Sequence, residues 1–412
     1  MGDGAVVRPD QVSLGVLVSS VPRDVIDAAV LACEVGAKRS GGKLPPHVVA
    51  YLTMGLWVFA ADPYEEVATK VTGALDRFGC WDADWTVPTS SGITQARKRL
   101  GAKAMRLVFE QIAEPVATPT TRGAWLRGFR LLAIDGFDAD APDSKQNAEE
   151  FGYANGGRGR SGYPKVRVVA LSECGTHAFL AAEIGAYSVG EKTLARRMYG
   201  QLHDDELLTA DRNFYSFTDW GLAVRTGAQL LWRAPTGLGL PVVKILPDGT
   251  YWSVLISPEI RSRARREQLL AAATAGDDLD PDQAHLVRVI EYDVPDRDGN
   301  GTGELIVLLT TILDPQAARP DELAAGYHER WEQETGHDQL KTHLRGPGKI
   351  LRSELPDLVH QELWAWLIVQ YAMAALITRA AEAADIDPDR LSYTRALRIV
   401  RRTATGTAGF SP

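Results

Sequence analysis

Cysteine is scarce in this sequence of 412 residues. Cys33, Cys80 and Cys174 lie far apart, and no Cys-x-x-Cys pair occurs. This scarcity argues against a disulfide framework and against a cysteine-based zinc site, and it favours a reducing cytoplasm.

Segments that would direct the chain to a membrane are also missing. The first residues, MGDGAVVRPD, lack the basic region and apolar run of a secretory signal. The most apolar stretch, residues 363–377, is short for a bilayer and contains Gln370. We therefore expect a buried helix there and no membrane partner.

Several cofactor motifs are absent as well. No P-loop or dinucleotide fingerprint occurs, so the sequence does not support nucleotide hydrolysis. Residues 296–304 resemble a calcium loop, but Val307 occupies the position that needs a bidentate glutamate, which favours a turn. His328, His337 and His343 lack the HExxH spacing of a zinc site, so we interpret them as solvated or DNA-facing.

The net charge of −8 does not by itself point to a nucleic-acid partner. Local charge matters more than the total, because a binding surface is made by neighbouring side chains. Residues 151–172 contain no acid but four cations. These cations are Arg158, Arg160, Lys165 and Arg167. A nucleic-acid surface and a solvated basic loop both fit this pattern.

Residues 1–120 read as an all-helical N-terminal region. Prolines at positions 45, 46 and 63 suit the first turns of two helices. A third helix follows Ser90 or Ser91 as N-cap and carries Arg97, Lys98 and Arg99; another covers residues 102–113. Short helices with a basic third member suit a helix-turn-helix-like unit for DNA ends, although a small bundle with one basic surface fits too.

From residue 128 the pattern changes to an α/β order. Apolar strands are predicted at 129–137, 165–173, 177–187 and 205–214, the middle two joined by a tight turn at 174–176. A helix capped by Ser188 precedes the fourth strand, and a helix and another strand follow it. This order predicts one mixed sheet. Residues 235–303 read as a β-rich insertion, after which a strand and a long helix return to the core.

Two acids follow predicted neighbouring strands. Asp135 and Asp211 each end an apolar run, and such strand ends converge on the edge of an α/β sheet where ligands bind. Two carboxylates placed there repel each other unless a cation neutralises them, and oxygen ligands suit Mg²⁺ or Mn²⁺. Either acid alone could equally be a turn or helix cap.

A third acid belongs to a spaced set on the late helix. Tyr327, Arg330, Glu334 and Lys341 are separated by steps of three, four and seven residues, which places them on one helical face. Such a face could present a metal ligand to a phosphate and hold that phosphate with cations. The alternative is an Arg330–Glu334 salt bridge on an exposed helix.

With these residues in view, the sequence resembles DDE transposases of the insertion-sequence-four group, which have a ribonuclease H-like core. Their signature around the third acid is Y-(2)-R-(3)-E-(6)-K, and YHERWEQETGHDQLK fits it at each position. AIDGF and TADRNF look like the first and second catalytic blocks, and LPPHVVAYLTMGLWVF and SSGITQARKRLG resemble the N-terminal domain of the group. The likeness therefore covers most of the chain.

The resemblance implies a catalytic and metal-binding triad of Asp135, Asp211 and Glu334 with two Mg²⁺ ions, for which Mn²⁺ could substitute. It also implies that Tyr327, Arg330 and Lys341 bind DNA. The implied partners are the double-stranded transposon ends and target DNA, bound by a homodimer at the bacterial nucleoid in the cytoplasm.

The resemblance further implies a tryptophan of the insertion that stacks a flipped base at a hairpin stage. Trp252 is the first candidate and Trp232 the second, and core packing is the alternative for both.

The domain organisation predicted from these features has four parts: a DNA-end-binding region at 1–120, a catalytic core at 121–234 and 304–380, the insertion at 235–303, and a basic helix with a tail at 381–412. Members of the group often continue into a longer basic tail. A catalytically inactive or domesticated DNA-binding derivative is therefore the alternative to an active transposase. A ribonuclease H-fold nuclease that never joins ends is a third hypothesis, which the helical N-terminal region disfavours.

Overall fold

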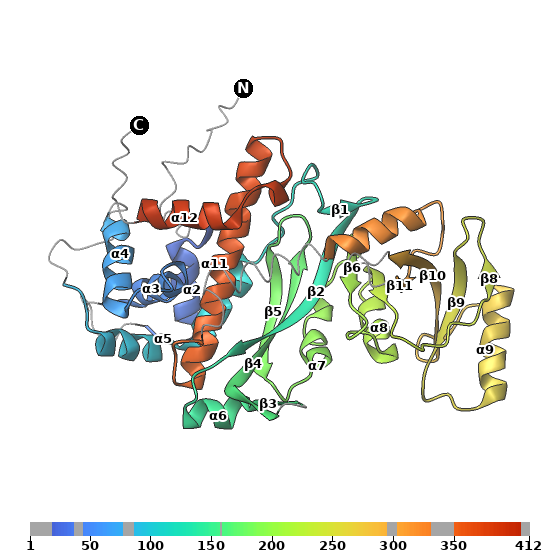
Figure 1. The fold of residues 1–412 in the computed structure, drawn as a ribbon, viewed down its shortest axis with the longest axis horizontal. Helices are drawn as coiled ribbons and strands as arrows, with labels where there is room; N and C mark the ends of the chain where they lie inside the picture. Colours follow the sequence, from blue (N-terminus) through green and yellow to red (C-terminus); the bar gives the residue numbers. More distant parts are fainter. Residues whose placement is uncertain are drawn as a thin grey trace.

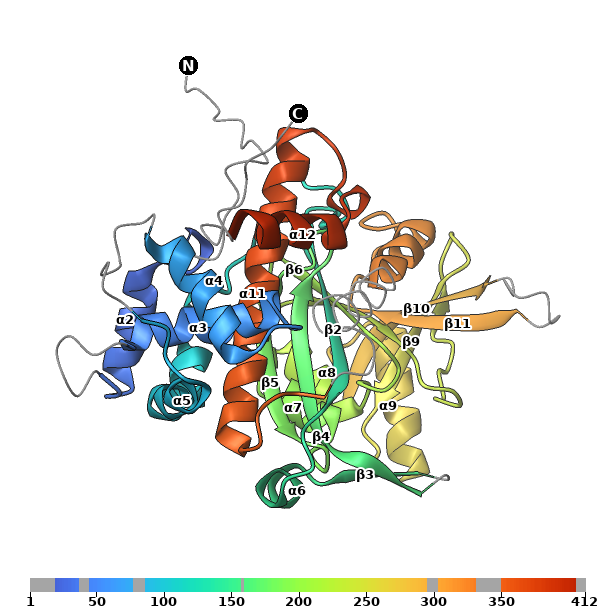
Figure 2. The same ribbon diagram turned by 60° about the vertical axis from the view of Figure 1, so that its left-hand side comes forward.

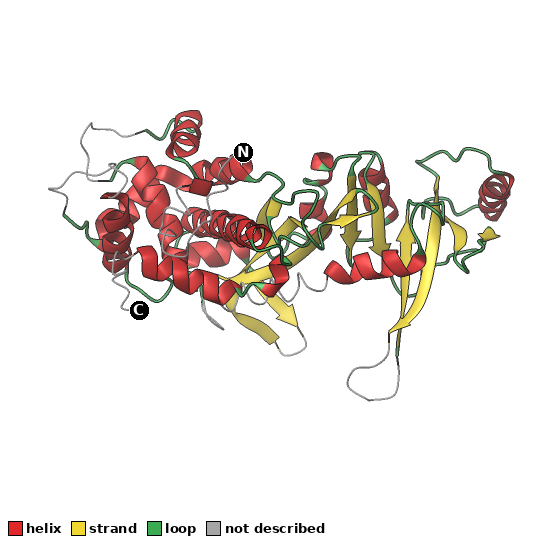
Figure 3. Cartoon of the chain, turned by 90° about the horizontal axis from the view of Figure 1, so that it is seen from above, coloured by secondary structure: helices red, strands yellow, loops and turns green. Residues whose placement is uncertain are grey.

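The computed structural model describes residues 19–36, 44–76, 86–156, 159–294, 303–330 and 350–404. Helices occupy one end of the molecule, a long sheet runs through its middle, and further strands with one helix occupy the other end (Figure 1). Seen from above, one end consists mainly of helices, and the strands of the rest of the molecule have helices beside them (Figure 3).

The N-terminal region is helical, as predicted. Its elements are α2 (Arg23–Ala32), α3 (Pro46–Val58), α4 (Tyr64–Asp76) and α5 (Ser90–Ile112). The N-cap of α5 is Thr89, whose hydroxyl accepts a hydrogen bond from the Gly92 amide. The prediction that Ser90 or Ser91 is the N-cap was therefore wrong. The two predicted helices at 90–113 form one element with a kink at Gly101, whose φ of 73° a residue with a side chain rarely adopts.

One large sheet contains most of the strands. Its first strands are β1 (Trp125–Leu126), β2 (Phe129–Asp140), β3 (Tyr153–Gly156), β4 (Gly159–Glu173), β5 (Phe179–Ala186), β6 (Glu206–Ala210) and β7 (Gln229–Arg233). The later strands are β8 (Lys244–Ile245), β9 (Tyr251–Ile256), β10 (Ala284–Val294) and β11 (Glu304–Thr310). The order is β3-β4-β2-β6-β7-β11-β10-β9-β8, with β5 beside β4 and β1 beside β2.

The centre of the sheet has the ribonuclease H-like arrangement that the sequence predicts. Strand β2 pairs antiparallel with β4, which pairs antiparallel with β5. On its other side β2 pairs parallel with β6, and β6 pairs parallel with β7. The predicted hairpin at 165–187 and the mixed α/β fold class are therefore confirmed.

The helices beside these central strands are short. They are α6 (Lys145–Phe151), α7 (Glu191–Ala195) and α8 (Phe217–Val224). The helix expected from Ser188 onward is only α7, which has Gly190 as its N-cap, followed by the 3₁₀ turn η2 (Tyr199–Gln201). Gly190 has no side chain that could cap the helix, and no side-chain cap is made there.

The long helix α11 (Pro356–Ala383) lies between the helical region and the sheet (Figures 1 and 2). By length and hydropathy it could cross a membrane, but 78% of its most apolar window is buried inside the protein. This confirms the predicted buried helix. Trp366 joins both regions, because its ring lies 6.1 Å from that of Trp57 in α3 and 4.9 Å from that of Phe137 in β2.

The described part of the region at 235–303 contains strands β8, β9 and β10, together with one helix that the sequence did not predict. This helix is α9 (Arg263–Ala275), with Ser262 as its N-cap. Its buried side chains, Leu269 and Ala273, pack with Val254 and Ala284 in a small separate core. The chain ends in η3 (Pro388–Arg390) and the predicted basic helix α12 (Tyr393–Ala404).

Candidate active site

The two strand-end acids lie next to each other in the sheet. Strands β2 and β6 run parallel with Ile134 opposite Ala210, so Asp135 and Asp211 follow at the next position of each chain. Both side chains are half-buried. Asp135 does not end its strand, because β2 continues past the predicted end at residue 137 to Asp140 by pairing with β4. It stands instead where the paired segment of β6 ends.

Both acids point to the sheet face that carries the late helix. Side chains alternate between the two faces of a strand, so Asp135 and Asp211 share a face with Leu131 and Leu207. Those two leucines pack in one cluster with Tyr327. The described part of the late helix, residues 320–330, therefore covers the face to which the two acids belong.

A glycine brings this helix close to the sheet. A Cβ atom at Gly326 would lie 2.3 Å from Cδ1 of Leu126 in β1, a separation that real Cβ atoms do not show. The missing side chain thus sets how near the helix, and the Tyr327 beside it, lie to the strands.

Tyr327 and Arg330 are both buried in this helix. Tyr327 is 0% exposed and Arg330 3%, and the guanidinium carbon of Arg330 lies 5.3 Å from the centre of the Tyr327 ring. Burial raises the pKa of Tyr327, Arg330 lowers it, and Asp211 raises it, which places this tyrosine within the field of the second acid. Arg330 itself is therefore buried and not exposed, while its predicted salt-bridge partner Glu334 lies outside the described residues.

The remaining two members of the tetrad, Glu334 and Lys341, lie outside the described residues. Their positions in the site, and the contacts of Tyr327 and Arg330 with DNA, stay predictions.

Two charged residues that the sequence reasoning missed adjoin the acid pair. Arg233 follows Trp232, which pairs with Ala210, so it stands beside Asp211 at the end of β7. It is 8% exposed and forms an ion pair with Glu304. The second is Glu191, the first residue of α7. Strand register would have revealed Arg233 once β6 and β7 were recognised as parallel neighbours.

The basic stretch at 151–172 is largely part of the sheet. Lys165 forms an ion pair of 2.6 Å with Asp140, and Arg167 one of 3.0 Å with Asp138. Each pair joins directly opposed residues of β2 and β4. The acids that balance these cations thus come from another strand, so the described part of this stretch is not simply a solvated basic loop.

The basic third helix contains both structural and exposed cations. Arg97 is 0% exposed and binds side chains and a carbonyl of the segment at 353–361, whereas Lys98 and Arg99 are exposed. Arg97 therefore has a packing role, and Lys98 and Arg99 remain candidates for a DNA contact.

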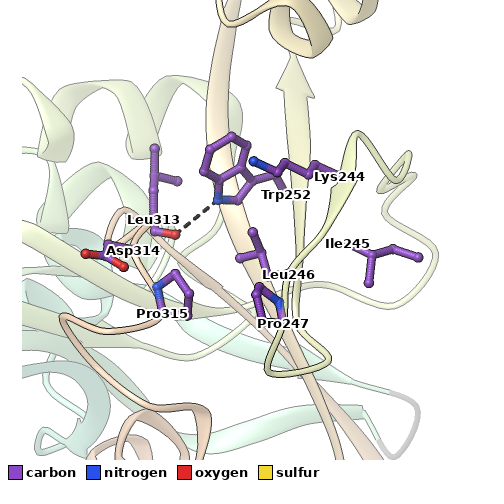
Figure 4. A pocket seen from close by; sticks show the side chains of 8 residues that line it. All are labelled: Lys244, Ile245, Leu246, Pro247, Trp252, Leu313, Asp314 and Pro315. Carbon is purple, nitrogen blue, oxygen red and sulfur yellow. Dashed lines mark hydrogen bonds between the residues drawn. The ribbon is translucent and has the colours of Figure 1, made fainter.

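The two tryptophan candidates have different surroundings. Trp232 is 0% exposed, with its ring 5.5 Å from that of Trp220 in the core. Trp252 in β9 lines an open pocket of about 630 Å³ and donates a hydrogen bond of 3.1 Å to the Leu313 carbonyl. The Lys244 ammonium lies 4.8 Å from the centre of its ring (Figure 4). Only Trp252 of the two presents an accessible ring.

The acid pair fits the divalent cations that the sequence predicts. Asp135 and Asp211 supply carboxylate oxygens, the donors that Mg²⁺ and Mn²⁺ prefer. None of the described residues donates a hydrogen bond to the Asp211 carboxylate or forms an ion pair with it. Within the described ranges no three His, Cys, Asp or Glu side chains are grouped closely enough to hold a metal. The predicted third ligand, Glu334, lies outside those ranges.

Comparison with known sequences identifies the family. Residues 127–371 match the family described as Transposase DDE domain, and residues 11–110 match the family described as Insertion element 4 transposase N-terminal. The chain belongs to the DDE transposase family. The resemblance to the insertion-sequence-four group is thereby confirmed, and the first match covers all six predicted site residues.

Individual proteins are also similar to this chain. The chain is similar to the transposase InsG for insertion sequence element IS4 of Escherichia coli strain K12, with 27% identity over 90% of this chain and 78% of the relative. It is 32% identical to the putative transposase InsZ of the same strain, over 40% of this chain and 54% of that protein. Among solved structures, the piggyBac transposase synaptic complex with hairpin DNA aligns with a TM-score of 0.48 and 11% identity, over 97% of this chain and 80% of that one.

Proposed function

We propose that this chain is the transposase of an insertion sequence, which binds the terminal inverted repeats as a homodimer and cleaves and joins DNA strands. The observation that carries this proposal is the placement of Asp135 and Asp211 as in-register neighbours beneath the helix that contains Tyr327 and Arg330. The first acid, the second acid and the helix with Tyr327 and Arg330 belong to separate segments of the chain, and all three lie on one side of one sheet.

Asp135, Asp211 and Glu334 would hold two divalent ions. When bound, two such ions about 3.5–4 Å apart activate the attacking oxygen and stabilise the leaving one during in-line displacement at phosphorus. The described acids are held on the backbone of paired strands, which fixes their separation before any ligand arrives.

The cationic residues around the acids would orient the DNA. Lys341 and Arg330 would bind phosphate oxygens near the reacting bond, and Arg330 is already held against the Tyr327 ring. Water would be the nucleophile during strand nicking, and a DNA 3′-hydroxyl during hairpin closure or strand transfer.

The test is a cleavage and joining assay with purified full-length protein, labelled terminal-repeat DNA and Mg²⁺. Asp135→Asn, Asp211→Asn and Glu334→Gln should each lower the cleavage rate by about 10²-fold or more, the scale for loss of one preorganised group. Asp140→Asn is the matched control, because Asp140 lies on the same strand but is paired with Lys165. Equal rates for wild type and the three variants would refute the catalytic assignment.

Loss of a phosphate contact should have a different signature. Lys341→Ala should weaken binding to terminal-repeat DNA and make its dependence on salt shallower by about 0.9 in the log–log slope. The same assays also distinguish the two alternative functions, a DNA-binding derivative without catalysis and a nuclease that never joins ends. The derivative would bind the repeats but not cut them, and the nuclease would cut branched DNA without joining ends.

Trp252 is the proposed platform for a flipped base. Its half-exposed ring and the nearby Lys244 offer stacking and cationic contacts, worth about 1–3 kcal/mol per stacked base. Terminal-repeat DNA with 2-aminopurine at each end position should show a quenched signal with wild type and a restored one with Trp252→Ala. No difference between the two proteins at any position would refute this role.

A further inference from the structure

The basic helix α12 lies near the C-terminal end of the chain but packs onto the N-terminal helices. It contacts α4 and α11, and this placement is visible from two directions (Figures 1 and 2). Tyr393, Leu397 and Val400 are at most 9% exposed and belong to the core cluster that contains residues of α2, α3 and α5. The helix therefore shares a core with the region predicted to bind DNA ends.

One arginine of α12 fixes the helix to the rest of the protein. Arg401 is half-buried, and its guanidinium donates a hydrogen bond to the carbonyl oxygen of Val58, the last residue of α3. This cation therefore contributes to packing and is not available on the surface.

The other three arginines of α12 form a stripe on its outer face. Arg395, Arg398 and Arg402 are all exposed. At about 100° per residue, they fall within about 60° of one another and about 160° from the centre of the buried face. From the first to the last they span about 10 Å along the helix axis. The stripe is long enough to meet more than one phosphate of a DNA strand.

The protein does not neutralise the charge of this stripe. Residues 391–404 contain no acid, although the chain as a whole has a net charge of −8. The preceding acid Asp389 pairs with His177 at 2.5 Å. In the part of the chain that the structure describes, no carboxylate forms an ion pair with Arg395 or Arg398. The outer face of α12 is therefore a local concentration of positive charge.

The stability of the helix does not account for the stripe. Arg395 lies in the first turn of α12, where the helix dipole disfavours a cation. The neighbours Arg395 and Arg398, and Arg398 and Arg402, are like charges three and four residues apart, which repel each other. An anionic partner along this face would compensate both effects. A membrane surface does not fit, because the apolar face that would enter it is packed against α4 and α11.

We propose that Arg395, Arg398 and Arg402 bind the phosphate backbone of the terminal-repeat duplex. The planar guanidinium group of arginine suits phosphate, because it can donate two parallel hydrogen bonds to its oxygens. Such contacts position a duplex without reading its sequence. Terminal-repeat DNA is favoured over target DNA because α12 shares its core with the helices predicted to hold the DNA end. The inference rests on the proposed function.

The test measures binding of full-length protein to a labelled terminal-repeat duplex by fluorescence anisotropy, without Mg²⁺ and at several salt concentrations. The double variant Arg395→Gln with Arg398→Gln should make the log–log salt dependence shallower by about 1.8, since two phosphate contacts are lost. Its affinity at about 0.1 M salt should fall by about tenfold or more. The preference for the repeat over a random duplex should stay the same, and so should the temperature of unfolding, because both side chains are exposed.

A second double variant, Arg23→Gln with Arg263→Gln, is the matched control. It changes the net charge by the same amount, but each of its arginines is exposed and paired with an acid four residues along its helix. The control should keep nearly the affinity and salt dependence of wild type. Equal losses in the two double variants would mean that net charge governs binding, and would overturn the role of the stripe.

Two further measurements separate this inference from the proposed function. Hydroxyl-radical footprinting should show that the α12 double variant no longer protects one continuous block of the repeat backbone. If wild type prefers the repeat and the double variant has the same affinity and footprint, only the inference fails. Unchanged repeat binding with weaker strand transfer into plasmid DNA would assign the stripe to target DNA and also overturn it. If wild type binds the repeat no better than a random duplex, the proposed function itself fails.

Discussion

Arg97 illustrates how one basic residue can look like a DNA contact in the sequence and serve the core in the structure. Its guanidinium donates hydrogen bonds to the Gln361 side chain at 2.9 Å, to Ser353 Oγ at 3.1 Å, to the Leu358 carbonyl at 3.2 Å and to the Tyr64 hydroxyl at 3.0 Å. One side chain therefore ties α5 to the start of α11.

Replacing this residue should destabilise the protein. Arg97→Met keeps much of the volume but leaves several buried acceptors without a donor, so the free energy of unfolding should fall by about 2–4 kcal/mol. Urea unfolding followed by circular dichroism measures this change. Arg99→Met, on the exposed side of the same helix, should alter stability by no more than about 0.5 kcal/mol. Similar losses in both variants would refute the structural role of Arg97.

His285 should make stability depend on pH. Its side chain is 8% exposed and its ring lies 5.0 Å from that of Phe217, and burial lowers its pKa from the usual 6.5. The unfolded chain then binds the proton more readily than the folded one. The stabilisation is therefore complete above pH 6.5 and is lost as the pH falls from 6.5 towards the lower pKa of the folded state.

The variant His285→Gln removes this titration. In the pH window just below 6.5, the unfolding free energy of wild type should fall more steeply than that of the variant, by up to about 1.4 kcal/mol per pH unit. Urea unfolding at a series of pH values provides the comparison. Parallel curves for the two proteins would mean that His285 does not titrate differently on folding.

At the scale of elements, helices and strands could be predicted from the sequence where contacts between residues close in the chain determine them. The hairpin of β4 and β5 and the buried helix α11 were predictable, because a continuous segment of each shows the apolar residues and their spacing. The continuation of β2 past residue 137, the end predicted for this strand, was not, since residues 138–140 belong to the strand only by pairing with β4. Helix α9 was not predicted from its sequence, RARREQLLAAATA. Only Leu269 and Ala273 are buried in it, so its apolar pattern is weak.

The residues of the candidate site differ in the same way in how far the sequence could predict them. Asp135, Asp211, Tyr327 and Arg330 could be identified from motif spacing, and the structure brings them to one side of the sheet. Glu191 carried no such signal. Its place near Asp135 depends on α7 packing against β2 at Gly136, a contact between residues 55 positions apart in the chain.

Close packing at Gly326 gives a prediction for the helix at 320–330. Gly326→Val should force this helix away from Leu126, which costs about 1–3 kcal/mol of stability for overpacking. Because Tyr327 is the next residue, cleavage of terminal-repeat DNA should fall further than the loss of folded protein explains. Gly200→Val is a suitable control, since nothing lies within 4 Å of a Cβ atom at that position. Full activity in folded Gly326→Val would show that the spacing is not critical.

At the scale of the whole molecule, the N-terminal helices and the sheet share one hydrophobic core. The cluster that contains α3 and α5 also contains Phe137 of β2 and Phe179 of β5. Trp366 of α11, 4% exposed, lies among them, 5.7 Å from the Phe179 ring. The insertion, by contrast, has its own small core around α9. The region predicted to bind DNA ends and the region predicted to cut them thus share one core, which would suit the proposed function of holding a DNA end while cleaving it.

This shared core predicts coupled unfolding of the two regions. Trp366→Ala should lower the free energy of unfolding by about 3–5 kcal/mol, and hydrogen exchange should increase together in α3 and in β2, since the same side chain touches both. Trp252→Ala, at a half-exposed site in the insertion, should leave exchange in both elements unchanged. Mass spectrometry of exchanged peptides distinguishes the outcomes. Faster exchange in α3 with full protection in β2 would mean that the helical region opens on its own, and that the core does not transmit the position of a bound DNA end to the acid pair.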